Sequence, residues 1–172
     1  WYGTFLGKYR TPAREDDPRP PVAHFYHAQQ DWLEARQAGK DWSWSTLRPH
    51  GVWGFSVGSA MNLLTGIACY AAIAKAEGGP LNWPGHPGFY GRLYQMIDVD
   101  LLARAMAWTA TTPAAANNAF NITNGDLFRW AHVWPRIADF FDMEAGDPAP
   151  VKISDAMSDK GALWDRMVSE RG

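Results

Sequence analysis

Four side chains near the N-terminus are of types that carry chemistry: His24, Tyr26, His27 and Asp31. The two imidazoles and the carboxylate stand at positions i, i+3 and i+7, which fall near one face of a helix and suit a zinc ion. A solvated helix face explains the same pattern. No further cysteine or carboxylate cluster stands at metal-ligand spacing in the sequence, so we predict no metal site.

Tyr26 is the candidate proton donor of this segment. A phenol keeps its proton at neutral pH and can donate it to an oxygen of a bound substrate. Most tyrosines instead pack their ring and leave the hydroxyl in water. The residue type alone leaves both roles open.

A glycine-rich stretch, Pro49–Ser59 (PHGVWGFSVGS), is a second candidate site. Its glycines allow a ligand to approach the backbone, and the start of a helix capped by Ser59 would favour a phosphate. The stretch lacks the Gly-x-Gly-x-x-Gly pattern of a dinucleotide fingerprint. Ser56 formally matches the Gly-x-Ser-x-Gly motif of hydrolases, but the expected strand ends about eight residues earlier, so we assign no nucleophile. Cys69 lies in an apolar segment and is expected to be structural.

The elements that must position these groups alternate between strands and helices. Apolar residues at spacings of three and four predict a helix over 22–37, with Phe25, Ala28, Trp32 and Ala35 on one stripe. Further helices are expected over 60–76, 98–111, up to 141 and 155–168, strands over 42–47, 80–83, 94–97 and 119–122, and loops over 1–21, 50–58, 84–91 and 147–150. This alternation predicts an α/β fold with a parallel sheet.

The composition limits the partners and the compartment. The chain has 172 residues, of which 47% are hydrophobic, so it can form a packed core. Lys and Arg number 16 against 18 Asp and Glu, which argues against a nucleic-acid partner. The longest apolar stretch, Leu63–Ala74, is shorter than the ~20 residues of a membrane span, so we expect no membrane segment. A single cysteine fits a reducing compartment, and we expect a cytoplasmic protein.

Four stretches, in order along the chain, resemble one enzyme family. They are His24–His27 with Asp31; Trp44–Pro49, Gly54–Ser56 and Ser59–Leu63; Tyr70–Ile73, Gly79–Leu81, Pro84–Gly85 and Asp98–Leu101; and Asn118–Asp126 with Phe128 and Trp130. Together they resemble the second half of extended short-chain dehydrogenases/reductases of the progesterone 5β-reductase and iridoid synthase-like type. The resemblance implies the C-terminal part of a Rossmann-type doubly wound sheet plus a mostly helical substrate-binding region. We place the boundary between residues 1–58, with the tyrosine helix, and residues 59–172.

The resemblance also implies a reaction. Such enzymes use NADP(H), with NAD(H) as the alternative, to reduce the carbon–carbon double bond of an enone or enal. Tyr26 matches the catalytic tyrosine of the family and is also expected to contact the cofactor. Pro49 and Val52 match residues beside the nicotinamide, and Ser59 and Met61 match residues near the cofactor phosphates. The implied partners are a small-molecule enone, the absent N-terminal half of the same protein and a second copy of the chain.

Departures from the family pattern concern the substrate and the absent half. His27 replaces a second tyrosine, and His50 replaces a glycine. Trp1-Tyr2 resembles the pair that follows the catalytic lysine, which would therefore precede Trp1, as would the phosphate-binding loop.

Two other functions on the same fold remain open. A sugar-nucleotide epimerase or dehydratase normally has lysine four residues after the tyrosine, where this chain has Gln30. A non-enzymatic dinucleotide-sensing regulator would tolerate loss of the tyrosine. The presence of Tyr26 therefore argues against a regulator. The reductase interpretation is therefore favoured over both.

Overall fold

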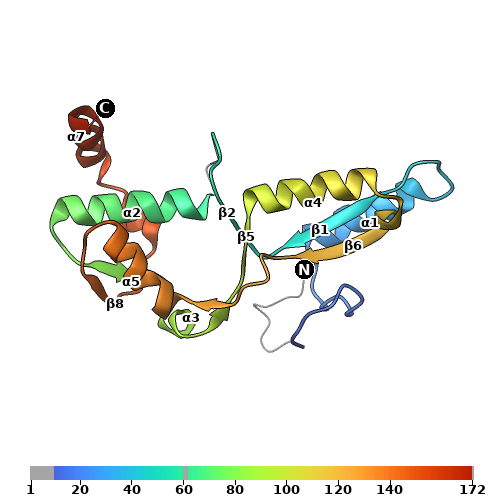
Figure 1. Cartoon of the computed structure of the whole chain (residues 1–172), viewed down its shortest axis with the longest axis horizontal. Coiled ribbons are helices and arrows are strands. Elements are labelled where there is room, and N and C mark those ends of the chain that lie inside the picture. The colour runs from blue at the N-terminus through green and yellow to red at the C-terminus, as the bar shows by residue number, and fades with distance from the viewer. Residues whose placement is uncertain (1–9, 60–61, 172) are drawn as a thin grey trace. The chain divides into compact units, whose positions relative to one another are not determined.

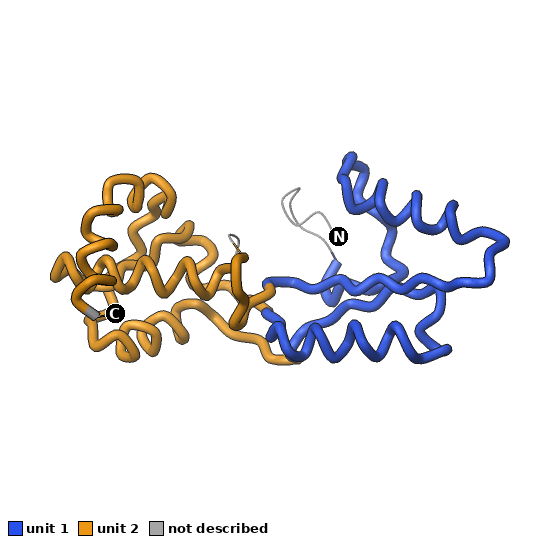
Figure 2. The backbone as a smooth tube through the Cα atoms, turned by 90° about the horizontal axis from the view of Figure 1, so that it is seen from above, with its two compact units in different colours: residues 1–51, 96–124 blue, residues 52–95, 125–172 orange. Residues whose placement is uncertain are grey.

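The computed structural model describes residues 10–59 and 62–171 and divides into two compact units (Figure 2). Unit 1 contains residues 1–51 and 96–124, and unit 2 contains residues 52–95 and 125–172. The chain thus passes from one unit to the other three times. Within the described residues, no helix is both long and apolar enough to cross a bilayer.

Unit 1 is built on two parallel strands, β1 (Ser45–Pro49) and β6 (Asn118–Ile122). Their register runs from Ser45 opposite Asn118 to Pro49 opposite Ile122, so both carboxyl ends lie at one edge. The helices α1 (Phe25–Gln37) and α4 (Val99–Thr111) lie on opposite sides of this pair (Figures 1 and 2). The α/β fold with a parallel pair is confirmed.

The remaining elements of unit 1 are short, and η2 (Pro113–Ala115) precedes β6 while β5 (Met96–Asp98) precedes α4. Asp98 caps α4 by accepting hydrogen bonds from the backbone nitrogens of Asp100 (2.9 Å) and Leu101 (3.2 Å). The ring of Trp108 on α4 packs edge-on against Phe120 of β6, with centroids 5.5 Å apart. This contact joins the helix to the strand pair.

Unit 2 combines helices with short strands in two pairs. Its elements are α2 (Leu63–Glu77), β3 (Leu81–Trp83), α3 (Pro87–Tyr90), β4 (Leu93–Tyr94), β7 (Phe128–Arg129), α5 (Trp130–Phe140), β8 (Ala145–Pro148), α6 (Ile153–Ala156) and α7 (Gly161–Arg171), with β2 (Gly51–Trp53) at the boundary. Strands β3 and β8 pair in parallel, and β4 and β7 pair antiparallel. The helix α2 ends at Gly78, whose φ of 77° is one that glycine adopts without strain.

Several predicted boundaries are wrong, and the pairing of distant segments explains most of them. The first strand is 45–49 rather than 42–47, because Ser45 to Pro49 are the residues that face β6. The predicted loops 50–58, 84–91 and 147–150 contain β2, α3 and part of β8, while 94–97 and 155–168 each divide into two elements. The helix expected from residue 60 begins at Leu63 instead, because Asn62 supplies the cap.

Tryptophan rings form the core of unit 2. Trp83 lies 4.9 Å from Trp130 and 5.0 Å from Trp134 between ring centroids. Trp134 is fully buried, and its indole nitrogen donates a hydrogen bond of 2.9 Å to the carbonyl oxygen of Leu81, which is also fully buried. This bond joins α5 to β3 through the centre of the unit.

Replacing Trp134 by Phe in the whole protein should lower the free energy of unfolding by about 2 kcal/mol. The change removes the indole hydrogen bond, leaves the buried Leu81 carbonyl without that donor and reduces the apolar volume of the core. Chemical denaturation measures the loss. The matched control is Trp164→Phe on α7, where the side chain is 38% exposed and the loss should be well below half as large. Equal losses in the two variants would contradict the prediction.

Candidate active site

Tyr26 lies in the first turn of α1, at the carboxyl edge of the parallel strands. α1 is about 20 Å long and is followed, after residues 38–44, by β1, which runs back alongside it for about 16 Å. The first turn of α1 therefore lies beside the end of β1, where Pro49 stands. In α/β sheets, ligands bind beyond the carboxyl ends of parallel strands.

A hydrogen bond from Arg48 ties α1 to this edge. The Nη2 atom of Arg48 donates to Oε1 of Gln30 over 3.4 Å. Gln30 is one helical turn after Tyr26 and on the same face of α1, and its Nε2 atom donates to Glu34 over 2.7 Å. Tyr26 and Pro49 are therefore brought to the same end of unit 1. Val52 belongs to unit 2, so its place opposite Tyr26 stays a prediction.

The phenol of Tyr26 is accessible to a ligand. Its side chain is 53% exposed, and its ring lies 4.1 Å from that of Phe25 and 5.1 Å from that of His24, between centroids. Among residues 10–59 and 62–171 its hydroxyl has no hydrogen-bond partner, so the O–H group is available to a substrate oxygen. Burial instead raises the pKa of Tyr70 and of Tyr94, which belong to unit 2.

A segment that the sequence only indicated as irregular crosses the same edge. Arg48 Nη1 donates to the carbonyl oxygen of Glu15 over 3.1 Å, and the Glu15 carboxylate accepts from the backbone nitrogen of Asn121 over 2.7 Å. The Asn121 side-chain amide also donates to the carbonyl of Ala13 over 3.1 Å. The Arg48-Pro49 pair at the end of β1 is a sequence signal that could have identified Arg48 as a residue of this edge. No local pattern indicated that Glu15 would lie there.

Two glycines of the glycine-rich stretch adopt backbone angles that favour glycine. Gly54 has a φ of 142° and Gly58 a φ of 73°, values that other residues rarely adopt. Val52 is 37% exposed in β2, and Ser59 is exposed but does not cap α2. Met61 lies outside the described residues. The cofactor contacts of these residues remain proposals.

Two of the three possible metal ligands at the start of α1, His24 and Asp31, are engaged elsewhere. Nδ1 of His24 caps the helix by accepting from the backbone nitrogen of Tyr26 over 3.3 Å, and its ring centroid is 6.1 Å from that of His27. Asp31 is paired with Arg19 over 2.5 Å. In the described part of the chain, no group of three or more His, Cys, Asp or Glu side chains is arranged to hold a metal ion.

Purified whole protein should therefore contain no stoichiometric zinc. The capping role turns one imidazole nitrogen of His24 toward the helix backbone, which leaves too few converging ligands for a four-coordinate site. Elemental analysis of wild-type protein and of His24→Ala gives the test. One zinc per chain in the wild type, lost in the variant, would overturn this prediction.

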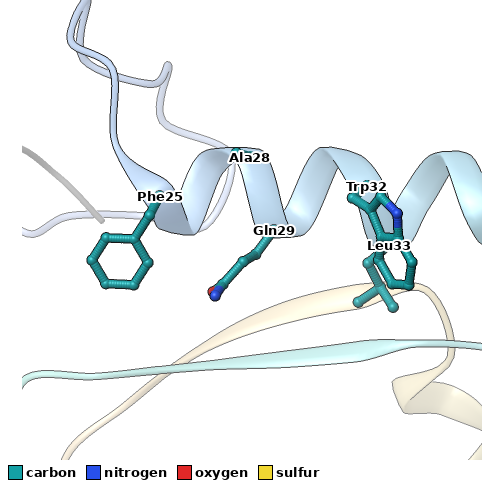
Figure 3. Close-up of a pocket in the computed structure, with 5 residues that line it drawn as sticks. All are labelled: Phe25, Ala28, Gln29, Trp32 and Leu33. Carbon is teal, nitrogen blue, oxygen red and sulfur yellow. The ribbon is translucent and has the colours of Figure 1, made fainter.

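The apolar face of α1 borders a hollow of about 570 Å³ (Figure 3). It is lined by Phe25, Ala28, Gln29, Trp32 and Leu33. Figure 3 shows Phe25, Gln29 and Leu33 directed from α1 toward the strands. Phe25 is 59% exposed and Trp32 is 65% exposed, so this predicted core stripe lies largely uncovered.

Comparison with known protein families gives one match over nearly the whole chain. Residues 3–172 match the PRISE family, described as a PRISE-like Rossmann-fold domain. An (S)-8-oxocitronellyl enol synthase of Nepeta racemosa is 42% identical over 170 residues, which cover 96% of this chain and 43% of the relative. A 3-oxo-Delta(4,5)-steroid 5-beta-reductase of Arabidopsis thaliana is 35% identical over 167 residues, or 95% of this chain and 43% of the relative. The chain thus spans less than half the length of these relatives.

Solved structures show the same fold at low sequence identity. RMD from Pseudomonas aeruginosa, complexed with NADPH, has a TM-score of 0.63 at 14% identity over 90% of this chain and 57% of its own. A UDP-N-acetylglucosamine 4-epimerase from Methanobrevibacter ruminantium has a TM-score of 0.59 at 18% identity over 88% of this chain and 49% of its own. At these identities the likeness concerns the fold alone.

Proposed function

Because this chain belongs to the family of PRISE-like Rossmann-fold domains, we propose that it is part of an NADP(H)-dependent reductase of enones and enals. The observation that carries the proposal is the half-exposed phenol of Tyr26 at the carboxyl edge of β1 and β6. The relatives named as enol synthase and steroid 5-beta-reductase support the same reaction class. NAD(H) is the alternative cofactor.

The residues of this chain fit the nicotinamide end of such a cofactor. Pro49 stands at the strand edge where ligands bind, and Val52 and Ser59 are exposed on the segment that follows. We place Pro49 and Val52 beside the nicotinamide and Ser59 and Met61 toward the phosphates. The nicotinamide, when bound, supplies a hydride to the β-carbon of the substrate.

Tyr26 would act on the other end of the conjugated system. As the β-carbon gains the hydride, the electron pair of the double bond shifts and negative charge develops on the carbonyl oxygen. The O–H group of Tyr26 donates a hydrogen bond to that oxygen and stabilises the enolate where it forms. Gln30 occupies the position of the usual epimerase lysine and bonds Arg48 and Glu34, which gives it a structural role.

The test uses purified whole protein with NADPH or NADH and two substrates, a cyclic enone and an α,β-unsaturated aldehyde. Cofactor oxidation gives the rate, and product analysis shows which bond is reduced. We expect reduction of the carbon–carbon double bond rather than of the carbonyl group. Epimerisation of a UDP-sugar without enone reduction would favour the epimerase alternative. Dinucleotide binding with neither reaction would favour the regulator.

A further inference from the structure

One side-chain amide holds residues 54–56, which follow β2. The Nδ2 atom of Asn62 donates a hydrogen bond of 2.7 Å to the carbonyl oxygen of Gly54. The same atom donates to the hydroxyl oxygen of Ser56 over 3.0 Å. Both donor positions of the amide are thus used on residues 54–56.

The oxygen of the same amide has a separate task. Oδ1 of Asn62 accepts hydrogen bonds from the backbone nitrogens of Leu64 (3.0 Å) and Thr65 (3.4 Å), which makes Asn62 the N-cap of α2. One half of the amide therefore caps the helix, and the other half fixes the loop. The two tasks can be separated chemically, because aspartate retains the acceptor and lacks the donors.

Among the described residues, few other contacts fix the conformation of residues 54–58. Phe55 is 85% exposed and Val57 is 87% exposed, so neither side chain anchors the loop by burial. Gly54 and Gly58, which both have positive φ angles, lack a side chain and so have conformational freedom that must be restricted in the folded state. Among the described residues, the side-chain hydrogen bonds that restrict it are those of Asn62.

We propose that Asn62 is a positioning residue for the dinucleotide, acting through this loop. The loop joins Val52 to Ser59, the two positions placed beside the nicotinamide and the phosphates, so this role rests on the proposed function. A loop fixed before binding loses less conformational freedom when the cofactor binds. Asn62 itself touches the loop and α2 and is assigned no contact with the cofactor.

The test is Asn62→Asp in the whole protein. Aspartate caps a helix about as well as asparagine, so the melting temperature should change little. The new carboxylate has no proton to donate and faces the carbonyl oxygen of Gly54. We expect faster proteolytic cleavage within residues 54–58 and a dissociation constant for NADPH roughly tenfold higher, as one lost hydrogen bond that leaves a polar group unpaired would give.

Two further variants control for simpler explanations. Ser56→Ala removes one of the two contacts and should raise the dissociation constant less than Asn62→Asp. Asp98→Asn alters the N-cap of α4, which lies outside the loop, and should change neither cleavage nor binding. An unchanged dissociation constant in Asn62→Asp would overturn the proposal. Asn62→Ala removes both the cap and the loop contacts, and a loss of stability in Asn62→Asp equal to that of Asn62→Ala would also overturn it. A wild-type protein that binds NADPH but reduces no enone would refute the proposed function. The NADPH dissociation constants of the wild type and Asn62→Asp would still test the role of Asn62.

Discussion

Replacing Tyr26 by Phe in the whole protein is expected to lower the turnover number for an enone by roughly 10²- to 10³-fold, as removal of one oxyanion donor does in other enzymes. Phenylalanine keeps the ring beside Phe25 and His24 and removes only the hydroxyl. The side chain is half exposed, so the fold should lose little stability. The affinity for NADPH should change by less than about threefold, because the hydroxyl is assigned to the transition state.

Steady-state kinetics and direct measurement of NADPH binding together test this expectation. Tyr90→Phe is the matched control, because Tyr90 lies in unit 2 against Trp83 and has no assigned part in the reaction. Its turnover should equal that of the wild type. Full activity in Tyr26→Phe would remove Tyr26 from the reaction. A parallel loss of activity and of NADPH affinity would instead point to cofactor binding.

The 172-residue chain by itself is expected to reduce no enone and to bind NADPH at least a hundredfold more weakly than the whole protein. The chain spans about 43% of the length of these relatives, and the resemblance assigns the phosphate loop and the catalytic lysine to the part of the relatives that this chain does not cover. Contacts with remote parts of a cofactor normally position its reacting end, so their loss lowers both affinity and rate.

The exposed face of α1 gives this prediction a structural reason and a second measurement. Phe25 and Trp32 border an unfilled hollow, and apolar surfaces of this kind are normally covered by further chain or by a second copy. The isolated chain should therefore self-associate in sedimentation experiments, and Trp32→Gln should reduce that association. Arg36→Gln on the same helix is the control and should not. Micromolar NADPH binding with turnover by the isolated chain would contradict the assignment of those cofactor contacts to the part of the relatives that this chain does not cover.

Local sequence determined the helices well because their signals are local. The 3.6-residue spacing of apolar side chains placed α1 and α4 within a few residues of their observed bounds. The predicted end of α2, residue 76, lies one residue before the observed end, and the left-handed Gly78 closes the helix. Tyr26 was found as a candidate from its residue type and its family motif, and the structure adds that its phenol is exposed.

The sequence located β3 and β6 to within one residue, but only the tertiary structure decided the other strands and the surroundings of the site. β2, β8 and the division of 94–97 into two strands depend on pairing with segments distant in sequence, which no local pattern reports. Glu15 meets Arg48 and Asn121 across more than thirty and more than a hundred residues of chain for the same reason. Ser59 and Asn62 are both good capping residues, so residue type could not choose between them. Asn62 is the cap because its amide makes hydrogen bonds both to the start of α2 and to Gly54. This geometry exists only when the chain is folded.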